Sequence, residues 1–302
     1  MTSGQATILF LVVCANSIAL FWVIHTLLGL VRELKRIDQR TELHTKGLIK
    51  LMKWRGELIN QTPAIKSAPT LAKLPASDGI PLVGHVIVVG ESGSGKSNLV
   101  MGNIIRRLEA GQQVHIVDTK QELSPYFNRH CQIVTPEQAV EKVNELLEQA
   151  DIRQKLFADT TLEHGKACLN IEDYARITGQ QLNVICLLLE ELVYLSKIID
   201  MASVIKLLVI GRSAGIYVFA ASQYLSAKIL DRDGSINFTT RIFMGVWDKV
   251  STGILFHTMT KQQADDFATF TGPPGRGIMV SLGKFTKKQF ELVPKSELEK
   301  FI

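Results

Sequence analysis

A glycine-rich segment with one lysine lies directly behind a run of apolar residues, and it restricts the chain to a small group of folds. Residues 90–97 read G-x-x-x-x-G-K-S and follow the apolar run Val86 to Val89. This pattern predicts a buried strand that ends at Gly90, a loop whose backbone N–H groups face phosphate, and a helix that opens at Ser97. A glycine-rich turn without a ligand would need neither a lysine at this spacing nor a flanking strand and helix.

This loop supplies the first set of candidate site residues. We expect Lys96 to lie between the β- and γ-phosphates of a nucleoside triphosphate, and Ser97 to bind Mg²⁺. The predicted nucleotide-binding residues are Gly90, Glu91, Ser92, Gly93, Ser94, Gly95, Lys96, Ser97 and Asn98. The sequence therefore predicts ATP and Mg²⁺ as cofactors.

The N-terminal residues predict a membrane anchor. From Ala6 to Val31 the chain carries no Lys, Arg, Asp or Glu, and this stretch is long enough to cross a bilayer as one helix. A buried core helix would show a polar face, and a cleaved signal peptide would carry a basic residue within Met1 to Gln5. Basic residues outnumber acidic ones between residues 32 and 57. By the positive-inside rule, we predict a single-pass anchor over residues 1–31 with the rest of the chain in the cytoplasm.

Residues 32–81 are predicted to connect this anchor to a globular part. Charged and apolar positions alternate over residues 32–60 without a heptad repeat. This pattern fits a juxtamembrane helix that lies on lipid headgroups or self-associates, and it fits a solvated spacer helix equally well. An extended linker follows, marked by Pro63, Pro69, Pro75 and Pro81. We therefore expect the globular part to span residues 82–302.

Composition excludes some classes of site. The cysteines are scattered and lack metal-ligand spacing, so neither a zinc site nor a disulfide framework is predicted; they are Cys14, Cys131, Cys168 and Cys186. The net charge of +5 is modest, and the basic residues after the anchor account for much of it. Charge alone therefore gives no argument for nucleic-acid binding.

Residues 82–302 alternate between strand and helix patterns. Apolar runs predict strands at 85–89, 114–117, 132–134, 184–189, 215–220, 241–245 and 277–280. Helices are predicted at 97–110, at 137–157 and around 205–210. Strands that are continuous apolar runs separated by helices are typical of a mostly parallel sheet covered on both faces. The predicted fold is therefore an α/β P-loop fold of the RecA/ASCE-like type.

Two of the predicted strands end in acidic residues that could serve a nucleotide site. Asp118 follows strand 114–117, whereas Glu190 and Glu191 follow strand 184–189. We favour the second strand, because a double acid offers one carboxylate for the metal and one for the attacking water. Glu190 is predicted to support Mg²⁺ and Glu191 to activate water, with an extra strand between this strand and the P-loop strand. Two solvated glutamates at the start of a helix are the alternative.

Other polar residues complete the candidate site. The strand at 215–220 runs into Gln223, which could hydrogen-bond the γ-phosphate or its attacking water, or merely cap the strand. Arg241 and Arg212 could each reach across a subunit boundary as an arginine finger, or pair locally. The predicted catalytic residues are Lys96, Glu191, Gln223 and Arg241.

Several collinear segments from about residue 82 to the C-terminus resemble the motor domain of FtsK/SpoIIIE-type DNA translocases. The matching segments are V-D-T-K at 117–120 with Glu122, Leu123 and Tyr126; N-I-E-D-Y at 170–174; G-R-S-A-G-I-Y at 211–217 with Ala221, Ser222 and Gln223; and I-N-F-T-T-R-I at 236–242. Together with the P-loop, they are far more specific than the P-loop alone.

The resemblance implies an ATP-driven ring, a homo-hexamer, that moves along double-stranded DNA without sequence preference and binds nucleotide between subunits. It also fits a membrane tether. Where the family usually has Asp-Glu, this chain has Glu190 and Glu191, so the carboxylate on the metal side is one methylene longer. Tyr224 stands where Arg-Pro commonly follows the glutamine. Candidate DNA-contacting residues are Lys228, Arg232, Lys249 and Lys261.

Three functions fit these observations. The first is a membrane-anchored ATPase that pumps DNA, in segregation, conjugative transfer or genome packaging. The second is a motor of the same fold that moves protein, whose hydrolysis of ATP would not respond to DNA. The third is an anchored scaffold that binds nucleotide to set ring assembly, and the retained Lys96, Glu191 and Gln223 argue against it.

Overall fold

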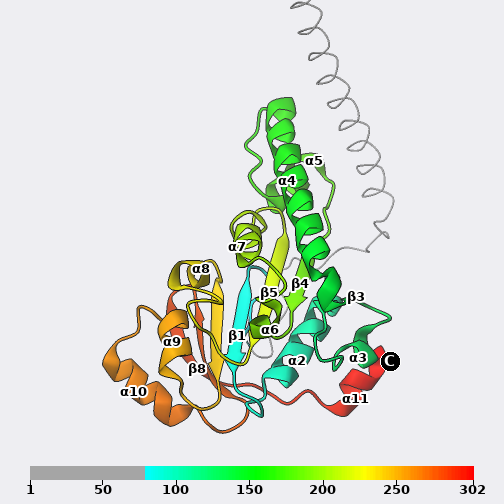
Figure 1. The fold of residues 1–302 in the computed structure, drawn as a ribbon. Helices are drawn as coiled ribbons and strands as arrows, with labels where there is room; N and C mark the ends of the chain where they lie inside the picture. Colours follow the sequence, from blue (N-terminus) through cyan, green and yellow to red (C-terminus); the bar gives the residue numbers. More distant parts are fainter. Residues whose placement is uncertain (1–78) are drawn as a thin grey trace, which may run out of the picture. The chain divides into compact units, whose positions relative to one another are not determined.

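The computed structural model describes residues 79–302 (Figure 1). The predicted anchor over residues 1–31, the juxtamembrane helix and nearly all of the linker lie outside the described residues. Within residues 79–302, no helix combines the length and the apolar character that crossing a bilayer requires.

Eight strands form one sheet in the order β3-β2-β4-β5-β1-β6-β7-β8. The pairs from β3 to β6 are parallel, and β7 and β8 add two antiparallel strands at one edge. The strands are β1 (Val86–Gly90), β2 (Gln113–Val117), β3 (Gln132–Val134), β4 (Ile185–Leu189), β5 (Ile216–Ser222), β6 (Thr240–Met244), β7 (Arg276–Ser281) and β8 (Lys284–Gln289). The predicted mostly parallel α/β sheet is confirmed.

Alternating side chains of each central strand face two separate hydrophobic cores. In β1, Ile87 and Val89 pack into one core with helices α4 (Ala139–His164) and α7 (Met201–Ile210). Val86 and Val88 pack into the other core with helix α2 (Lys96–Glu109). All five residues of β1, and all of β4 and β5, are buried. This burial on both faces explains why these strands appear in the sequence as unbroken apolar runs.

Helices cover both faces of the sheet. The longer helices are α2 (Lys96–Glu109), α4 (Ala139–His164), α5 (Ile171–Thr178), α7 (Met201–Ile210), α9 (Lys249–Leu255) and α10 (Lys261–Phe270). Short helices α3 (Ser124–Phe127), α6 (Leu192–Leu195), α8 (Arg232–Ile236) and α11 (Lys295–Leu298) lie between or after them. In Figure 1, the end of α4 and the whole of α5 project from the edge of the sheet opposite the β1–α2 loop.

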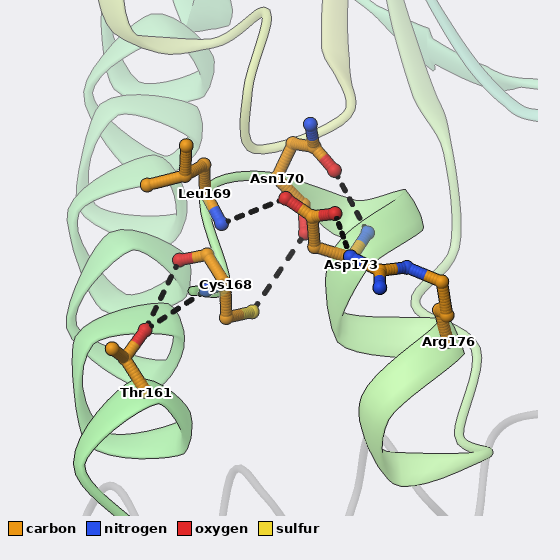
Figure 2. A network of polar contacts seen from close by, with 6 residues as sticks. All are labelled: Thr161, Cys168, Leu169, Asn170, Asp173 and Arg176. Carbon is orange, nitrogen blue, oxygen red and sulfur yellow. Dashed lines mark hydrogen bonds and ion pairs between the residues drawn. The ribbon is translucent and has the colours of Figure 1, made fainter. Parts of the chain in front are cut away.

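The segment at 170–174, which resembles a family motif, forms the start of α5 (Figure 2). The Asn170 side chain accepts a hydrogen bond from the backbone N–H of Asp173 at 2.8 Å, and the Asp173 carboxylate accepts one from the N–H of Leu169 at 3.0 Å. Upstream, the Thr161 hydroxyl accepts a hydrogen bond from the N–H of Cys168 at 3.0 Å. These contacts cap α5 and join it to α4, so the described role of this segment is structural.

A buried arginine ties the P-loop helix to the segment that enters the domain. Arg107 is 1% exposed. Its guanidinium donates to Asn103 Oδ1 at 2.6 Å, to the Gln112 side-chain oxygen at 2.8 Å and to the Leu82 carbonyl at 3.1 Å. Gln112 also donates to the Leu82 carbonyl. The far end of α2 is thereby fixed against the residues that precede β1.

We expect Arg107→Ala to lower the free energy of unfolding by about 3 kcal/mol, because it opens a cavity and leaves buried acceptors without donors. Arg176→Ala is the matched control: this helical arginine also has a partner, Asp173 at 2.6 Å, but 68% of its side chain is exposed. Its loss should cost less than about 0.5 kcal/mol. Urea denaturation of both variants tests this, and similar losses would contradict it.

Candidate functional site

The predicted strand–loop–helix geometry of the P-loop is present. The loop between β1 and α2 turns through Gly93 and Gly95, whose φ angles are 83° and 94°, in the left-handed region that favours glycine. Gly90 is required for a different reason: a Cβ there would lie 2.6 Å from the Met244 carbonyl oxygen. Helix α2 begins at Lys96, one residue earlier than predicted. Its first N–H groups therefore point into a loop that has no bulky side chain at its turns.

Neighbouring segments brace this loop. The N–H of Gly275 donates to the Ser94 carbonyl at 2.8 Å, and the N–H of Val246 donates to the Glu91 carboxylate at 3.0 Å. The Ser94 hydroxyl is buried and has no hydrogen-bond partner. An unpartnered buried hydroxyl beside the loop fits a phosphate, since such groups are otherwise nearly always hydrogen-bonded.

Lys96 lies in an environment that is unfavourable for its charge. The residue is 7% exposed. Burial lowers the pKa of its ammonium group, and the positive charge of Lys120 lowers it further, although Glu191 and Glu190 act in the opposite direction. A phosphate anion would restore the charge balance, which is the physical basis for the predicted role of Lys96.

The side chain of Asn98, a predicted nucleotide-binding residue, contacts the C-terminal segment. Its amide group donates to the Glu291 carbonyl at 2.8 Å, and its oxygen accepts from the N–H of Val293 at 2.8 Å. Both ends of the side chain therefore hold the C-terminal segment against α2. Binding of a nucleotide by Asn98 stays a prediction.

The acidic residues lie where the sequence predicted them. Strand β5 lies between β1 and β4 and pairs in parallel with both, so it is the predicted extra strand. Glu190 and Glu191 follow β4 and are 5% and 8% exposed, so the alternative of two solvated glutamates is wrong. Parallel strands end at one edge of a sheet, and this places both carboxyl groups at the edge that carries the P-loop.

Asp118, the other acidic strand end, is occupied by backbone contacts. Its carboxylate accepts hydrogen bonds from the N–H groups of Glu122, Leu123 and Ser124, at 3.2, 3.1 and 2.7 Å. The side chain thus organises the turn between β2 and α3. This use explains why Glu190 is the better candidate for a metal ligand.

Glu190 carries a perturbed carboxyl group. Burial raises its pKa, and a hydrogen bond with Asp118 and the negative charge of Asp118 raise it further, to about 7. Its Oε2 atom is buried without a hydrogen-bond partner. Within residues 79–302, no three His, Cys, Asp or Glu side chains converge as a preformed metal site. Mg²⁺ at nucleotide sites is usually held by one or two protein ligands together with phosphates, so Glu190 and Ser97 fit this ion.

Glu191 contacts one predicted site residue, Gln223, and one that was not predicted, Lys120. The backbone N–H of Gln223, an exposed residue after β5, donates to Glu191 Oε1 at 3.3 Å. Lys120 Nζ lies 3.0 Å from Glu191 Oε2. Burial acts to lower the pKa of Lys120, but the hydrogen bond and charge of Glu191 outweigh it, so the pKa is raised. The sequence signal for Lys120 was its place in the V-D-T-K match at 117–120.

The two arginines do not join this group within the chain. Arg241 lies in β6 opposite Ile87, three residues before the end of β1, and its Nη1 is 3.5 Å from Nδ1 of His257. Burial lowers the pKa of Arg241. Arg212 is exposed and precedes β5, so it lies at the sheet edge opposite the P-loop. A role across a subunit boundary stays a prediction for both.

Comparisons with solved structures support the fold. The chain is similar to the pCW3 conjugation coupling protein TcpA, with 21% identity and a TM-score of 0.60, over 74% of this chain and 65% of that one. It is also similar to ATPases 2 and 3 of EssC from Geobacillus thermodenitrificans (17% identity, TM-score 0.56, 72% and 43% covered). A third similar structure is the cytoplasmic domain of the type VII secretion ATPase EccC from Thermomonospora curvata (20% identity, TM-score 0.51, 70% and 26% covered).

The chain thus spans less than two thirds of each of these neighbours. No protein-family model and no curated protein sequence matches it. The likeness to these structures confirms the fold that the sequence resemblance implied.

The raised pKa of Glu190 makes a prediction for stability. Because its folded-state pKa is about 7 rather than 4.5, the stability it contributes is present at low pH and is lost as pH rises through 7. Glu190→Gln removes this effect. At each pH, the quantity to compare is the unfolding free energy of the variant minus that of the unaltered protein. This difference should be about 2 kcal/mol larger at pH 8 than at pH 5. Urea denaturation without nucleotide measures it, and an equal difference at both pH values would contradict it.

Proposed function

We propose that this chain is an ATP-hydrolysing motor of the FtsK/HerA type. One observation carries the proposal: Glu191, Gln223 and the P-loop lysine Lys96 lie at the same edge of the sheet, on three adjacent strands in the order β4, β5, β1. A nucleotide bound at the loop would have its γ-phosphate near Glu190 and Glu191. A glycine-rich turn without a ligand does not explain this arrangement.

Each of these side chains has a proposed role. Lys96 and the N–H groups of the loop bind the phosphates, and Ser97 and Glu190 hold Mg²⁺, which neutralises phosphate charge. Glu191 accepts a proton from the attacking water, and Gln223 orients that water or contacts the γ-phosphate.

The proposed substrate is double-stranded DNA, bound without sequence preference. The FtsK-like segments support this choice, and so does the likeness to a conjugation coupling protein. The candidate contact residues Lys228, Arg232, Lys249 and Lys261 are all exposed. Phosphate contacts by such lysines and arginines would make binding weaken as salt rises.

The proposed setting is a membrane-anchored ring. The uncharged segment at 6–31 and the basic residues after it support a single-pass anchor with the motor in the cytoplasm. The family resemblance supports a homo-hexamer. In such a ring, an arginine such as Arg241 or Arg212 would act on a neighbouring subunit's nucleotide.

A motor that moves protein is the second candidate. Its support is the likeness to the type VII secretion ATPase EccC. Both candidates use the same nucleotide site, so only the response to the substrate separates them.

We expect the purified full-length protein to hydrolyse ATP, and long double-stranded DNA to stimulate that hydrolysis. Lys96→Ala should reduce turnover by about a hundredfold or more, because the phosphates lose their buried cation. Stimulation should fall with increasing salt and should not depend on DNA sequence. A coupled ATPase assay with and without DNA measures each effect.

An ATP hydrolysis rate that is the same with and without DNA would favour the motor that moves protein. Binding of ATP without hydrolysis would contradict both motors and favour a nucleotide-binding scaffold. Equal turnover by the Lys96→Ala variant would show that the activity does not come from this site.

A further inference from the structure

The contact between Lys120 and Glu191 has no place in the roles above. Lys120 Nζ lies 3.0 Å from Glu191 Oε2, and the N–H of Gln223 donates to Oε1 at 3.3 Å. One oxygen of this carboxylate thus accepts a backbone hydrogen bond, and the other, which has no hydrogen-bond partner, lies in an ion pair with Lys120. A general base needs a hydrogen bond to its water, so Lys120 and the attacking water would compete for Oε2 of Glu191.

The backbone at both ends of this contact adopts an uncommon conformation. Glu191 has a φ of 60°, and Gln121, next to Lys120, has a φ of 57°. Within residues 79–302, Leu282 is the only other non-glycine residue with a positive φ. Such conformations cost about 1 kcal/mol or more each and are concentrated at active sites and switch regions. The contact between Lys120 and Glu191 is therefore held by two backbone positions, Gln121 and Glu191, whose conformations are energetically unfavourable.

Lys120 is also placed where it would meet a nucleotide. It follows strand β2, which pairs in parallel with β4, so it lies at the sheet edge that carries the P-loop. Its charge lies close enough to Lys96 to act on it. The Lys120 side chain is 33% exposed, whereas that of Glu191 is 9% exposed. The lysine therefore has more room to move than the glutamate.

We propose that Lys120 senses the γ-phosphate: it pairs with Glu191 in the nucleotide-free protein and moves its ammonium group to the γ-phosphate when ATP binds, which frees Glu191 to accept a proton. This inference rests on the proposed ATPase function. Lysine suits the role because its ammonium is a compact charge on a flexible stem. A γ-phosphate carries more negative charge than one carboxylate and competes for Lys120, whereas ADP lacks this group.

The test compares the binding of ATPγS and ADP, each with Mg²⁺, to the full-length protein by isothermal titration calorimetry. Lys120→Met removes the charge but keeps the apolar stem. It should weaken ATPγS about tenfold and leave the affinity for ADP within about twofold, because only ATPγS has a γ-phosphate for the lysine to bind. Lys120→Arg keeps the charge and should retain most of the preference for ATPγS.

A second variant tests the competition itself. Glu191→Gln should tighten ATPγS roughly threefold to fivefold, because it releases Lys120 from its ion pair. The gain should be absent in the Lys120→Met, Glu191→Gln double variant, since no lysine remains to be released. Lys287→Met is the matched control. Lys287 also forms an ion pair, with Asp266 at 2.7 Å, and its side chain is 37% exposed, but it lies on β8; neither affinity should change.

Equal effects of Lys120→Met on both nucleotides, including no effect, would overturn the sensor role and leave the ATPase proposal intact. A gain from Glu191→Gln that persists in the double variant would do the same. Failure of the unaltered protein to bind ATPγS would overturn both proposals. Thermal unfolding of every variant accompanies the titrations; if Lys120→Met does not fold, Lys120→Gln carries the same prediction.

Discussion

The parallel pairing of β5 with both β1 and β4 is the constraint on which the candidate site depends. It sets one strand between the phosphate-binding loop and the acidic residues. Neighbouring strands lie about 4.8 Å apart. A triphosphate whose phosphates bind the loop would therefore extend across the end of β5 toward the acidic residues. Because all three strands run in the same direction, Lys96, Gln223 and Glu191 reach the same edge. The two buried faces of the sheet hold these strands in register.

Charge balance is the second feature that organises the site. Glu191 pairs with Lys120, and the nearby Asp118 contributes to the raised pKa of Glu190. The charges of Lys120, Glu191 and Glu190 act on Lys96, which forms none of the ion pairs described for residues 79–302. The charge of Glu191 is thus paired with Lys120, whereas Lys96 is available to bind phosphate. Binding of a nucleotide would rearrange this set of contacts rather than add to an empty pocket.

The nucleotide site and the sheet could be predicted because their signals are local. The loop at 90–97 and the apolar run before Glu190 each lie within a few residues, and every predicted strand is present. Strand β8 was missed because its half-exposed sequence, K-F-T-K-K-Q, has no apolar run; lysines are typical of an edge strand. The contacts of Lys120 and Asn98 could not be predicted, because each joins residues that are far apart in the sequence. Asn170 was matched to a motif, yet its described contacts cap a helix.

The most direct test of this account is single-turnover hydrolysis of ATP by Glu191→Gln, measured beside its affinity for ATP. The account predicts that the rate of the chemical step falls by about a hundredfold or more, because the variant lacks a general base, while ATP still binds. Glu122→Gln, which alters an exposed carboxylate near the site, should leave the rate close to that of the unaltered protein. Unchanged single-turnover hydrolysis by Glu191→Gln would contradict the account, since it would show that the acid after β4 does not activate water.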